Sequence, residues 1–250
     1  MKEKNEFTHF GFQNVEVKEK AAKVSAVFDS VTNGYDLMND LMSLGTHRLL
    51  KEIAINHTKL RPGQAVLDLA GGTGDMALLL TDIVGTEGLV CMCDINKRML
   101  RKGRERLEDR GILSNTEYIQ GDGEILPFKD NFFDAVTISF GIRNFTEKDT
   151  ALASVIKTLK PNGRLVVLEF AKPSNPLIKK IYRSFSSLWP IIGKNLMGDE
   201  SSYEYLRESI EMHPDQETFL EMLVSTGFEQ ASYVNLLGGI VAIHTGNKPG

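Results

Sequence analysis

The chain has 250 residues, of which 42% are hydrophobic and 25% charged, a composition typical of one folded α/β unit. Its formal charge of −4 argues against bulk nucleic-acid binding, which favours a basic face, so we expect no nucleic-acid partner. No apolar run reaches the roughly 18 residues of a spanning helix, and the start lacks the apolar stretch of a signal peptide. Two cysteines, Cys91 and Cys93, make a poor metal site, so we expect no metal and a reducing cytoplasmic compartment.

The first 60 residues precede any strand pattern. Residues 1–20 are polar and predict a loose segment. Apolar residues three and four positions apart predict helices between Ala21 and Leu60, interrupted at Asn33-Gly34. We expect this region to be a helical cover over the rest of the chain.

From Ala65 onward, strands and helices alternate. The pattern predicts strands over 65–70, 89–94, 117–120, 133–139 and 164–170, with helices over 75–84, 97–110 and 146–159. Asn96 and Thr146 are expected to cap the second and third of these helices. Such alternation predicts an α/β fold with a doubly wound, mostly parallel sheet.

The alternation stops after residue 171. Residues 172–213 are expected to be an insertion, followed by a helix over 214–226. Strands over 228–235 and 240–245 are separated by Gly238-Gly239 and therefore predict an antiparallel hairpin that completes a seven-stranded sheet. The expected organisation is a cover (1–60), a binding core (61–171), a lid or insertion (172–213) and a closing helix and hairpin (214–250).

The first predicted strand runs into a glycine-rich loop, Asp68-Leu-Ala-Gly-Gly-Thr-Gly74. Glycines allow the backbone to approach a ligand closely, and the helix that follows offers unpaired N–H groups. Asp94 ends the second strand, where a carboxylate can accept both hydroxyls of a ribose. Together these features predict an adenosine-type cofactor at the switch point of the sheet.

The loop by itself leaves two cofactors open, because Gly72-x-Gly74-x-x-Ala77 also fits a dinucleotide fingerprint. Three features favour S-adenosylmethionine over NAD. The loop fits the acidic-x-Gly-x-Gly-x-Gly pattern with Ala70 at the first glycine, Asp122-Gly123 follows the third strand where an adenine amino group is expected, and the chain ends in an antiparallel hairpin. This layout resembles a class I methyltransferase with strand order 3-2-1-4-5-7-6.

Structural alternatives stay open for the acids. Asp94 can act as a helix cap beside Asn96, Asp122 as a solvated loop carboxylate, and Asp68 as a strand-end acid that orders the glycine loop.

Longer segments give a more specific resemblance. Five segments closely resemble the ubiquinone/menaquinone biosynthesis C-methyltransferase family: Thr8–Phe12, Tyr35–His47, Ser139–Asn144, Leu159–Phe170 and Met212–Gln216. The resemblance extends from about residue 8 to residue 247. The chain departs from the family pattern at Leu50, often Trp, at Asn162, often Gly, and at Ala171, often Ser.

The resemblance implies transfer of a methyl group from S-adenosylmethionine to a ring carbon of a polyprenylated quinol, either demethylmenaquinol, a methoxy-benzoquinol precursor of ubiquinone, or both. Other quinone-biosynthesis enzymes and a second copy of the chain are further expected partners. The residues expected to hold the cofactor are Asp68, Gly72, Thr73, Gly74, Asp94, Asp122, Gly123 and Ser139.

C-methylation of a quinol needs a ring made electron-rich by loss of a hydroxyl proton, together with donors for the oxyanion. We expect Arg143 to stabilise this phenolate and Asn144 to orient it or a water molecule. His213 is the candidate base, and Tyr35 is expected to close the pocket. The structural alternatives are a helix cap for His213, a core residue for Tyr35 and a surface ion pair for Arg143.

Residues 172–194 contain five basic residues and no acidic one, together with several large apolar residues and the single Trp189. This composition is typical of an interfacial segment. We expect it to contact anionic lipid at the inner face of the cell membrane and to cover the quinol head. The alternative is a cap packed on the sheet, with solvated lysines.

Two other kinds of function stay open from the sequence. One is an O- or N-methyltransferase acting on another small molecule. The other is a non-catalytic cofactor-binding module or a small NAD-dependent reductase.

Overall fold

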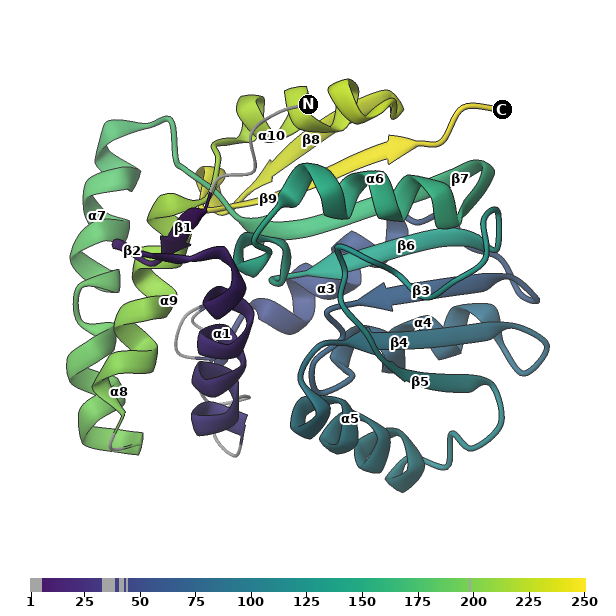
Figure 1. Ribbon diagram of the computed structural model, residues 1–250, viewed down its shortest axis with the longest axis horizontal. Helices are drawn as coiled ribbons and strands as arrows, with labels where there is room; N and C mark the ends of the chain where they lie inside the picture. Colours follow the sequence, from purple (N-terminus) through teal and green to yellow (C-terminus); the bar gives the residue numbers. More distant parts are fainter. Residues whose placement is uncertain (1–5, 33–38, 41–42, 44, 198) are drawn as a thin grey trace.

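The computed structural model describes residues 6–32, 39–40, 43, 45–197 and 199–250. At its centre lies a seven-stranded sheet with helices on both faces (Figure 1). From edge to edge the strands are β5 (Thr116–Gln120), β4 (Leu89–Asp94), β3 (Ala65–Leu69), β6 (Phe133–Ser139), β7 (Leu159–Phe170), β9 (Val241–Asn247) and β8 (Glu229–Leu236). The first five pair in parallel, whereas β9 is antiparallel to both β7 and β8. The predicted order 3-2-1-4-5-7-6 and the C-terminal antiparallel pair are therefore confirmed.

The sheet separates two apolar layers, because successive residues of a strand point to opposite faces. Leu67 of β3 shares one layer with residues of α6 (Lys148–Thr158) and α10 (Gln216–Thr226). Val66 shares the other with residues of α3 (His47–Asn56), α4 (Asp75–Val84) and α5 (Lys97–Asp109). Both side chains are 0% exposed, so the parallel strands are covered on both faces and their carboxyl ends form an edge available to a ligand.

The N-terminal segment is ordered, so the predicted loose stretch over residues 1–20 is wrong for its described part. β1 (Phe7–Phe10) and β2 (Gln13–Glu16) form an antiparallel hairpin, and α1 (Val17–Val31) follows directly. The hairpin lies on α9 (Glu200–Met212), where the rings of Phe10 and Tyr205 stack with centroids 4.3 Å apart. Most residues of these two short strands are exposed or half-exposed, so the sequence lacks the apolar run that would predict a strand.

Residues 172–213 form three helices, α7 (Pro176–Ser186), α8 (Trp189–Met197) and α9, which lie beside α1 in Figure 1. Trp189 is 0% exposed and packs edge-on against Tyr182 and Phe185, with centroids 6.0 and 5.8 Å away. The expectation that this tryptophan faces a membrane interface is therefore wrong. In the part of the chain that the structure describes, no helix has the length and apolar character needed to cross a membrane.

Capping explains where the helices begin. Asn96 caps α5 as predicted, since its Oδ1 accepts the N–H groups of Arg98 and Met99 at 2.9 and 3.0 Å. The predicted cap at Thr146 is wrong: α6 begins at Lys148, and the carboxylate of Glu124 accepts the Thr146 N–H at 2.7 Å. The carboxylate at the start of α6 therefore comes from Glu124, in the loop after β5, and not from a residue next to the helix.

Candidate functional site

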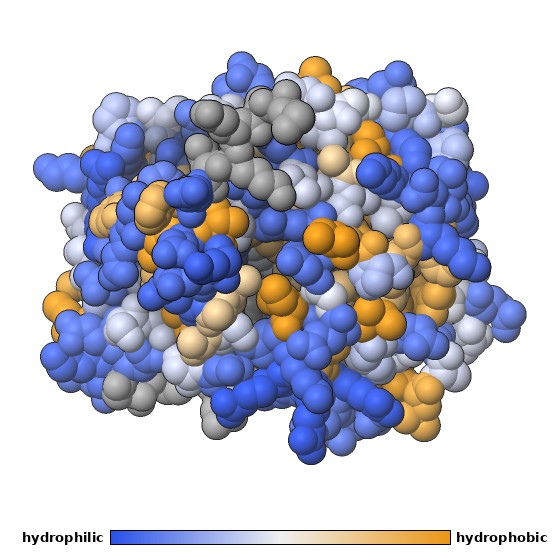
Figure 2. Space-filling view, viewed as in Figure 1, coloured by the Kyte–Doolittle hydropathy of each residue, from blue (hydrophilic) through white to orange (hydrophobic). Residues whose placement is uncertain are grey.

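A cavity of about 330 Å³ lies at the carboxyl ends of β3, β4, β5 and β6 and is covered by α1. The space-filling view is hollowed near the middle of this face, with apolar side chains gathered along the rim (Figure 2). The order of the strands reverses between β3 and β6, and such switch points are where ligands bind in doubly wound sheets.

The loop between β3 and α4 forms one wall. Gly72 lines the cavity, and its N–H donates to Asp94 Oδ2 at 2.9 Å. Gly74 serves packing instead, because a Cβ at this position would lie 2.7 Å from Leu107 Cδ1 of α5. Ala70 has a φ of 56°, and a Cβ at Gly141 would lie 2.6 Å from the Ala70 Cβ. A side chain at position 141 would therefore clash with the Ala70 side chain, and glycine avoids this clash.

Asp94 lines the cavity and is only 9% exposed. Its Oδ1 accepts the Asn96 N–H at 2.8 Å, while Oδ2 accepts the bond from Gly72. Burial raises the pKa of this carboxyl, and the two backbone hydrogen bonds oppose the rise. Each oxygen keeps a lone pair, so the carboxylate can still accept the hydroxyls of a ribose. Asn96, not Asp94, is the helix cap.

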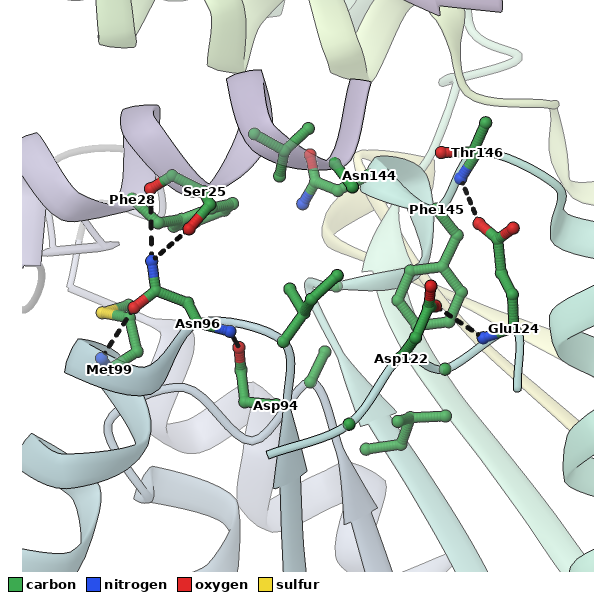
Figure 3. Close-up of a pocket in the computed structure, with 18 of the residues that line it drawn as sticks. Ser25, Phe28, Asp94, Asn96, Met99, Asp122, Glu124, Asn144, Phe145 and Thr146 are labelled. Carbon is green, nitrogen blue, oxygen red and sulfur yellow. Dashed lines mark hydrogen bonds between the residues drawn. The ribbon is translucent and has the colours of Figure 1, made fainter. Parts of the chain in front are cut away.

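Asn96 also fastens α1 across the cavity (Figure 3). Its Nδ2 donates to the Ser25 carbonyl oxygen at 3.2 Å and to Asp29 Oδ1 at 3.1 Å. Farther along the same helix, Lys20 Nζ donates to the carbonyl oxygen of Phe145 at 3.1 Å. Helix α1 is therefore tied to both sides of the cavity and limits the access of water to it.

The loop after β5 forms the opposite wall. The Asp122 carboxylate accepts the Glu124 N–H at 2.9 Å and lies at the cavity, as Figure 3 shows. Gly123 is buried, and a Cβ there would lie 2.8 Å from Phe145 Cζ. Phe145 also lines the cavity, and its ring offers an apolar surface on which a flat base can stack. Sequence reasoning missed Phe145, although it directly follows the Ser139–Asn144 segment.

A smaller polar cavity of about 10 Å³ adjoins the glycine loop. Asp68, Thr73 and Ser139 line it, and Ser139 lines the large cavity as well. Among the described residues, three of its buried atoms have no hydrogen-bond partner: Asp68 Oδ2, Thr73 Oγ1 and Ser139 Oγ. The other Asp68 oxygen accepts the Thr137 hydroxyl at 3.0 Å, but burial still raises the pKa of Asp68 to about 7.

These unpaired atoms provide a test of the expected cofactor. Buried polar atoms in folded proteins are normally hydrogen-bonded, so such a group awaits a partner. The amino-acid end of S-adenosylmethionine carries an ammonium donor and a carboxylate acceptor, and it matches one carboxylate and two hydroxyls. The residues present therefore fit this cofactor.

Asn144 is the predicted catalytic residue that the structure brings to the cavity. It ends the short helix η2 (Ile142–Asn144), and its amide nitrogen points into the cavity in Figure 3. Its Oδ1 accepts the hydroxyl of Tyr205 at 2.9 Å. Burial raises the pKa of Tyr205, so this phenol stays a donor. The sequence held no local signal for Tyr205, which lies on α9.

Arg143 lies outside the cavity lining and is only 6% exposed. Its Nη1 donates to Glu169 Oε1 at 2.9 Å and to the Phe140 carbonyl oxygen, and its Nε donates to Ser209 Oγ at 3.3 Å. The expected direct contact between Arg143 and a phenolate is therefore wrong. The guanidinium pairs with an acid, as in the alternative, but this acid is Glu169, which is buried and not at the surface.

His213 also lies outside the lining, at the end of α9, where its ring packs 5.4 Å from that of Phe219. Burial, followed by the charges of Lys148 and Arg143, holds the pKa of His213 well below its usual range. Its position matches the helix-end alternative and does not match a base facing this cavity. Tyr35 lies outside the described residues.

The insertion contributes no residue between 172 and 197 to the lining of the large cavity. The expected lid from this segment is therefore not the element that covers the site; α1 has that position.

Comparison with known proteins places this geometry in context. The ubiE/COQ5 methyltransferase family matches residues 15–248. The ubiquinone/menaquinone biosynthesis C-methyltransferase UbiE of Ectopseudomonas mendocina is 54% identical over 243 residues, covering 97% of this chain and 95% of that protein. The protein of the same name from Shewanella piezotolerans is 51% identical and covers 96% of each chain.

A solved structure supports the fold independently. The SAM-dependent methyltransferase from Aquifex aeolicus superposes with a TM-score of 0.60 at 17% identity, covering 84% of this chain and 98% of that one. At this identity the likeness concerns the fold.

Proposed function

The chain belongs to the ubiE/COQ5 methyltransferase family, and we propose that it transfers the methyl group of S-adenosylmethionine to a ring carbon of a polyprenylated quinol. The substrate is demethylmenaquinol, the methoxy-benzoquinol precursor of ubiquinone, or both. The observation that carries this conclusion is the match along almost the whole chain to relatives named for C-methylation in ubiquinone and menaquinone biosynthesis.

Each part of the cofactor has a candidate partner in the chain. Asp94 is assigned to the ribose hydroxyls, and Asp122 with Phe145 to the adenine. The unpaired atoms of Asp68, Thr73 and Ser139 are assigned to the amino-acid end. When bound, S-adenosylmethionine supplies a methyl group on a positively charged sulfur.

The chain's own residues prepare the quinol. Loss of one hydroxyl proton raises the electron density on the ring, and Asn144 Nδ2 is assigned to hold the resulting oxyanion or a water molecule that takes the proton. Helix α1 keeps bulk water from the reacting groups, which strengthens these polar contacts. Arg143 and Glu169 are positioning residues, because their ion pair fixes the short helix that carries Asn144.

A methyl-transfer assay with the full chain tests this function. The two quinols are offered separately with S-adenosylmethionine, and products are identified by mass. We expect at least one quinol to gain one methyl group. Cofactor binding in calorimetry without any methylated quinol would favour another small-molecule substrate or a non-catalytic module.

We further propose that α7 contacts the membrane in which a polyprenyl substrate resides. Leu177 and Ile181 on its outer side are 66% and 61% exposed, and the same helix carries the exposed cations Lys179, Lys180 and Arg183. An exposed apolar stripe with flanking cations is typical of an interfacial helix. Homodimerisation and contacts with other quinone-biosynthesis enzymes stay predictions.

Flotation with vesicles of anionic or neutral lipid tests the membrane contact. Wild-type chain should float with the anionic vesicles, and neutralising Lys179, Lys180 and Arg183 together should release it. Equal flotation of the wild type and the triple variant would remove α7 from the interface.

A further inference from the structure

A second cavity, of about 200 Å³, lies between α7, α9 and the segment that follows β7. It shares no lining residue with the cofactor cavity. Nothing in the proposed methyl transfer uses it. Its lining combines strong positive charge with two buried hydrogen-bond donors.

Four of its lining residues are cationic: Lys172, Lys179, Arg183 and Arg207. Glu211 is the single acid in this lining, and its Oε1 lies 3.8 Å from Arg183 Nε. In the described structure, neither Lys172 nor Lys179 has a carboxylate within 4.0 Å. The lining carries a formal charge of +3, and Glu208, whose Oε1 lies 3.7 Å from Arg207 Nη2, lowers the local sum to +2 in a chain whose total is −4. Such a concentration attracts an anion.

The donors are Tyr182 and Trp189. Trp189 is 0% exposed, and its Nε1 has no hydrogen-bond partner among the described residues. The buried Tyr182 hydroxyl has none either. Because an indole N–H can only donate, it needs an acceptor atom, and the lining cations cannot provide one. Both residues line this cavity, where an oxygen-rich anion would offer acceptors to these donors and to the cations.

We propose that this cavity binds a phosphate group. Several cations and neutral donors arranged around one cavity suit a phosphate, which offers several acceptor oxygens. The group can come from a phospholipid head or from a soluble phosphate. Helix α7 lines the cavity with Lys179 and Arg183 and carries the exposed Leu177 and Ile181 on its other side, which favours the lipid, and that choice of source rests on the proposed membrane contact.

The single tryptophan makes the site directly observable, since all indole fluorescence of the full chain comes from Trp189. Inorganic phosphate should change this emission in a saturable way, and chloride at matched ionic strength should not. Lys179→Gln should weaken the phosphate response about tenfold, because one charge-assisted contact is lost. Lys180→Gln is the matched control, because Lys180 is the next residue on α7 and lies outside the lining.

Vesicles then distinguish the two sources. If the phosphate belongs to lipid, Lys179→Gln should reduce binding to phosphatidylglycerol vesicles more than Lys180→Gln does. Equal losses in the two variants, with the phosphate response still specific to Lys179, would identify soluble phosphate as the ligand. No saturable phosphate response, or equal responses of the two variants to phosphate, would overturn the proposal.

Methylation of a short-chain quinol is measured in parallel. Failure of that reaction in the wild-type chain counts against the proposed function alone, because the fluorescence titration does not depend on it.

Discussion

The hydroxyl of Tyr205 donates a hydrogen bond to Asn144 Oδ1 at 2.9 Å, and this bond joins residues 61 positions apart. The phenol ring of Tyr205 stacks in turn on Phe10 of the N-terminal hairpin. The amide that points into the cavity is therefore oriented by a helix of the insertion, and that helix packs against the N-terminal hairpin. Segments that line no part of the cavity still determine its geometry.

Tyr205→Phe should lower kcat about 10- to 100-fold and leave the affinity for S-adenosylmethionine unchanged, because only the orientation of Asn144 is lost. The free energy of unfolding should fall by about 1 kcal/mol, the net value of one hydrogen bond. Steady-state kinetics and urea denaturation measure the two effects. Tyr203→Phe on the same helix is the control, since the hydrogen bond to Asn144 comes from Tyr205 and not from Tyr203. Equal kinetics for the two variants would remove Tyr205 from the positioning of Asn144.

Asp94→Asn should weaken S-adenosylmethionine binding about 100-fold. Asp94 accepts backbone N–H groups with both of its oxygens, whereas an asparagine has one acceptor oxygen and would turn its NH2 group toward the other N–H. Each charge-assisted bond that is lost is worth about 1.5–3 kcal/mol. Asp122→Asn should weaken binding about tenfold or less, because Asp122 is exposed and one of its oxygens keeps its local bond. Calorimetry with both purified variants measures the difference. The reverse order of affinities would contradict the ribose assignment.

Arg143→Ala should reduce the free energy of unfolding by about 3–5 kcal/mol, because Glu169, only 2% exposed, would be left as an unpaired buried charge. Adding Glu169→Gln should recover part of this loss. Urea denaturation compares wild type, single and double variants. A loss below about 1 kcal/mol in Arg143→Ala would show that the ion pair does not hold this region together.

Asp68→Asn should make the cofactor-free chain more stable near neutral pH. The pKa of Asp68 rises from 3.8 to about 7 on folding, so the folded state keeps a proton that the unfolded state has released. The stability from this group is present at acid pH and is lost as the pH rises through about 7. Between about pH 5 and pH 8 the advantage of the variant should grow by about 2–3 kcal/mol. Urea denaturation at several pH values measures it, and parallel pH profiles for the two proteins would contradict the assigned burial.

The same variant should bind S-adenosylmethionine more weakly, because the amide replaces an acceptor in the small polar cavity. A variant that is more stable but binds the cofactor more weakly would show that Asp68 contacts the cofactor. A carboxylate that only orders the glycine loop would not give this combination.

The parallel core could be predicted closely from the sequence. Strands β4 and β6 and helix α4 have the predicted bounds, because strands buried on both faces appear as short continuous apolar runs between glycine turns. The N-terminal hairpin could not be predicted in the same way, since its strands are short and half-exposed.

The cavity walls were likewise predictable where residues follow a strand end, as for Asp94, Asp122 and Asn144. The side chains that position other residues without lining the cavity could not be predicted in this way. Arg143 and Glu169 meet because β6 and β7 are neighbours, and their pairing joins positions 26 residues apart. The motif that contains Arg143 indicates a functional role for this residue, but only the fold shows that its guanidinium turns toward Glu169 and not into the cavity.

Methyl transfer to a ring carbon, rather than to oxygen, is tested most directly by an isotopic label. Demethylmenaquinol carrying deuterium at the unsubstituted ring carbon is incubated with the full chain and S-adenosylmethionine under reducing conditions, and the product is analysed by mass. Transfer to carbon predicts a product that gains one methyl group and loses the deuterium. A methylated product that retains the deuterium would show transfer to oxygen, and it would contradict the account.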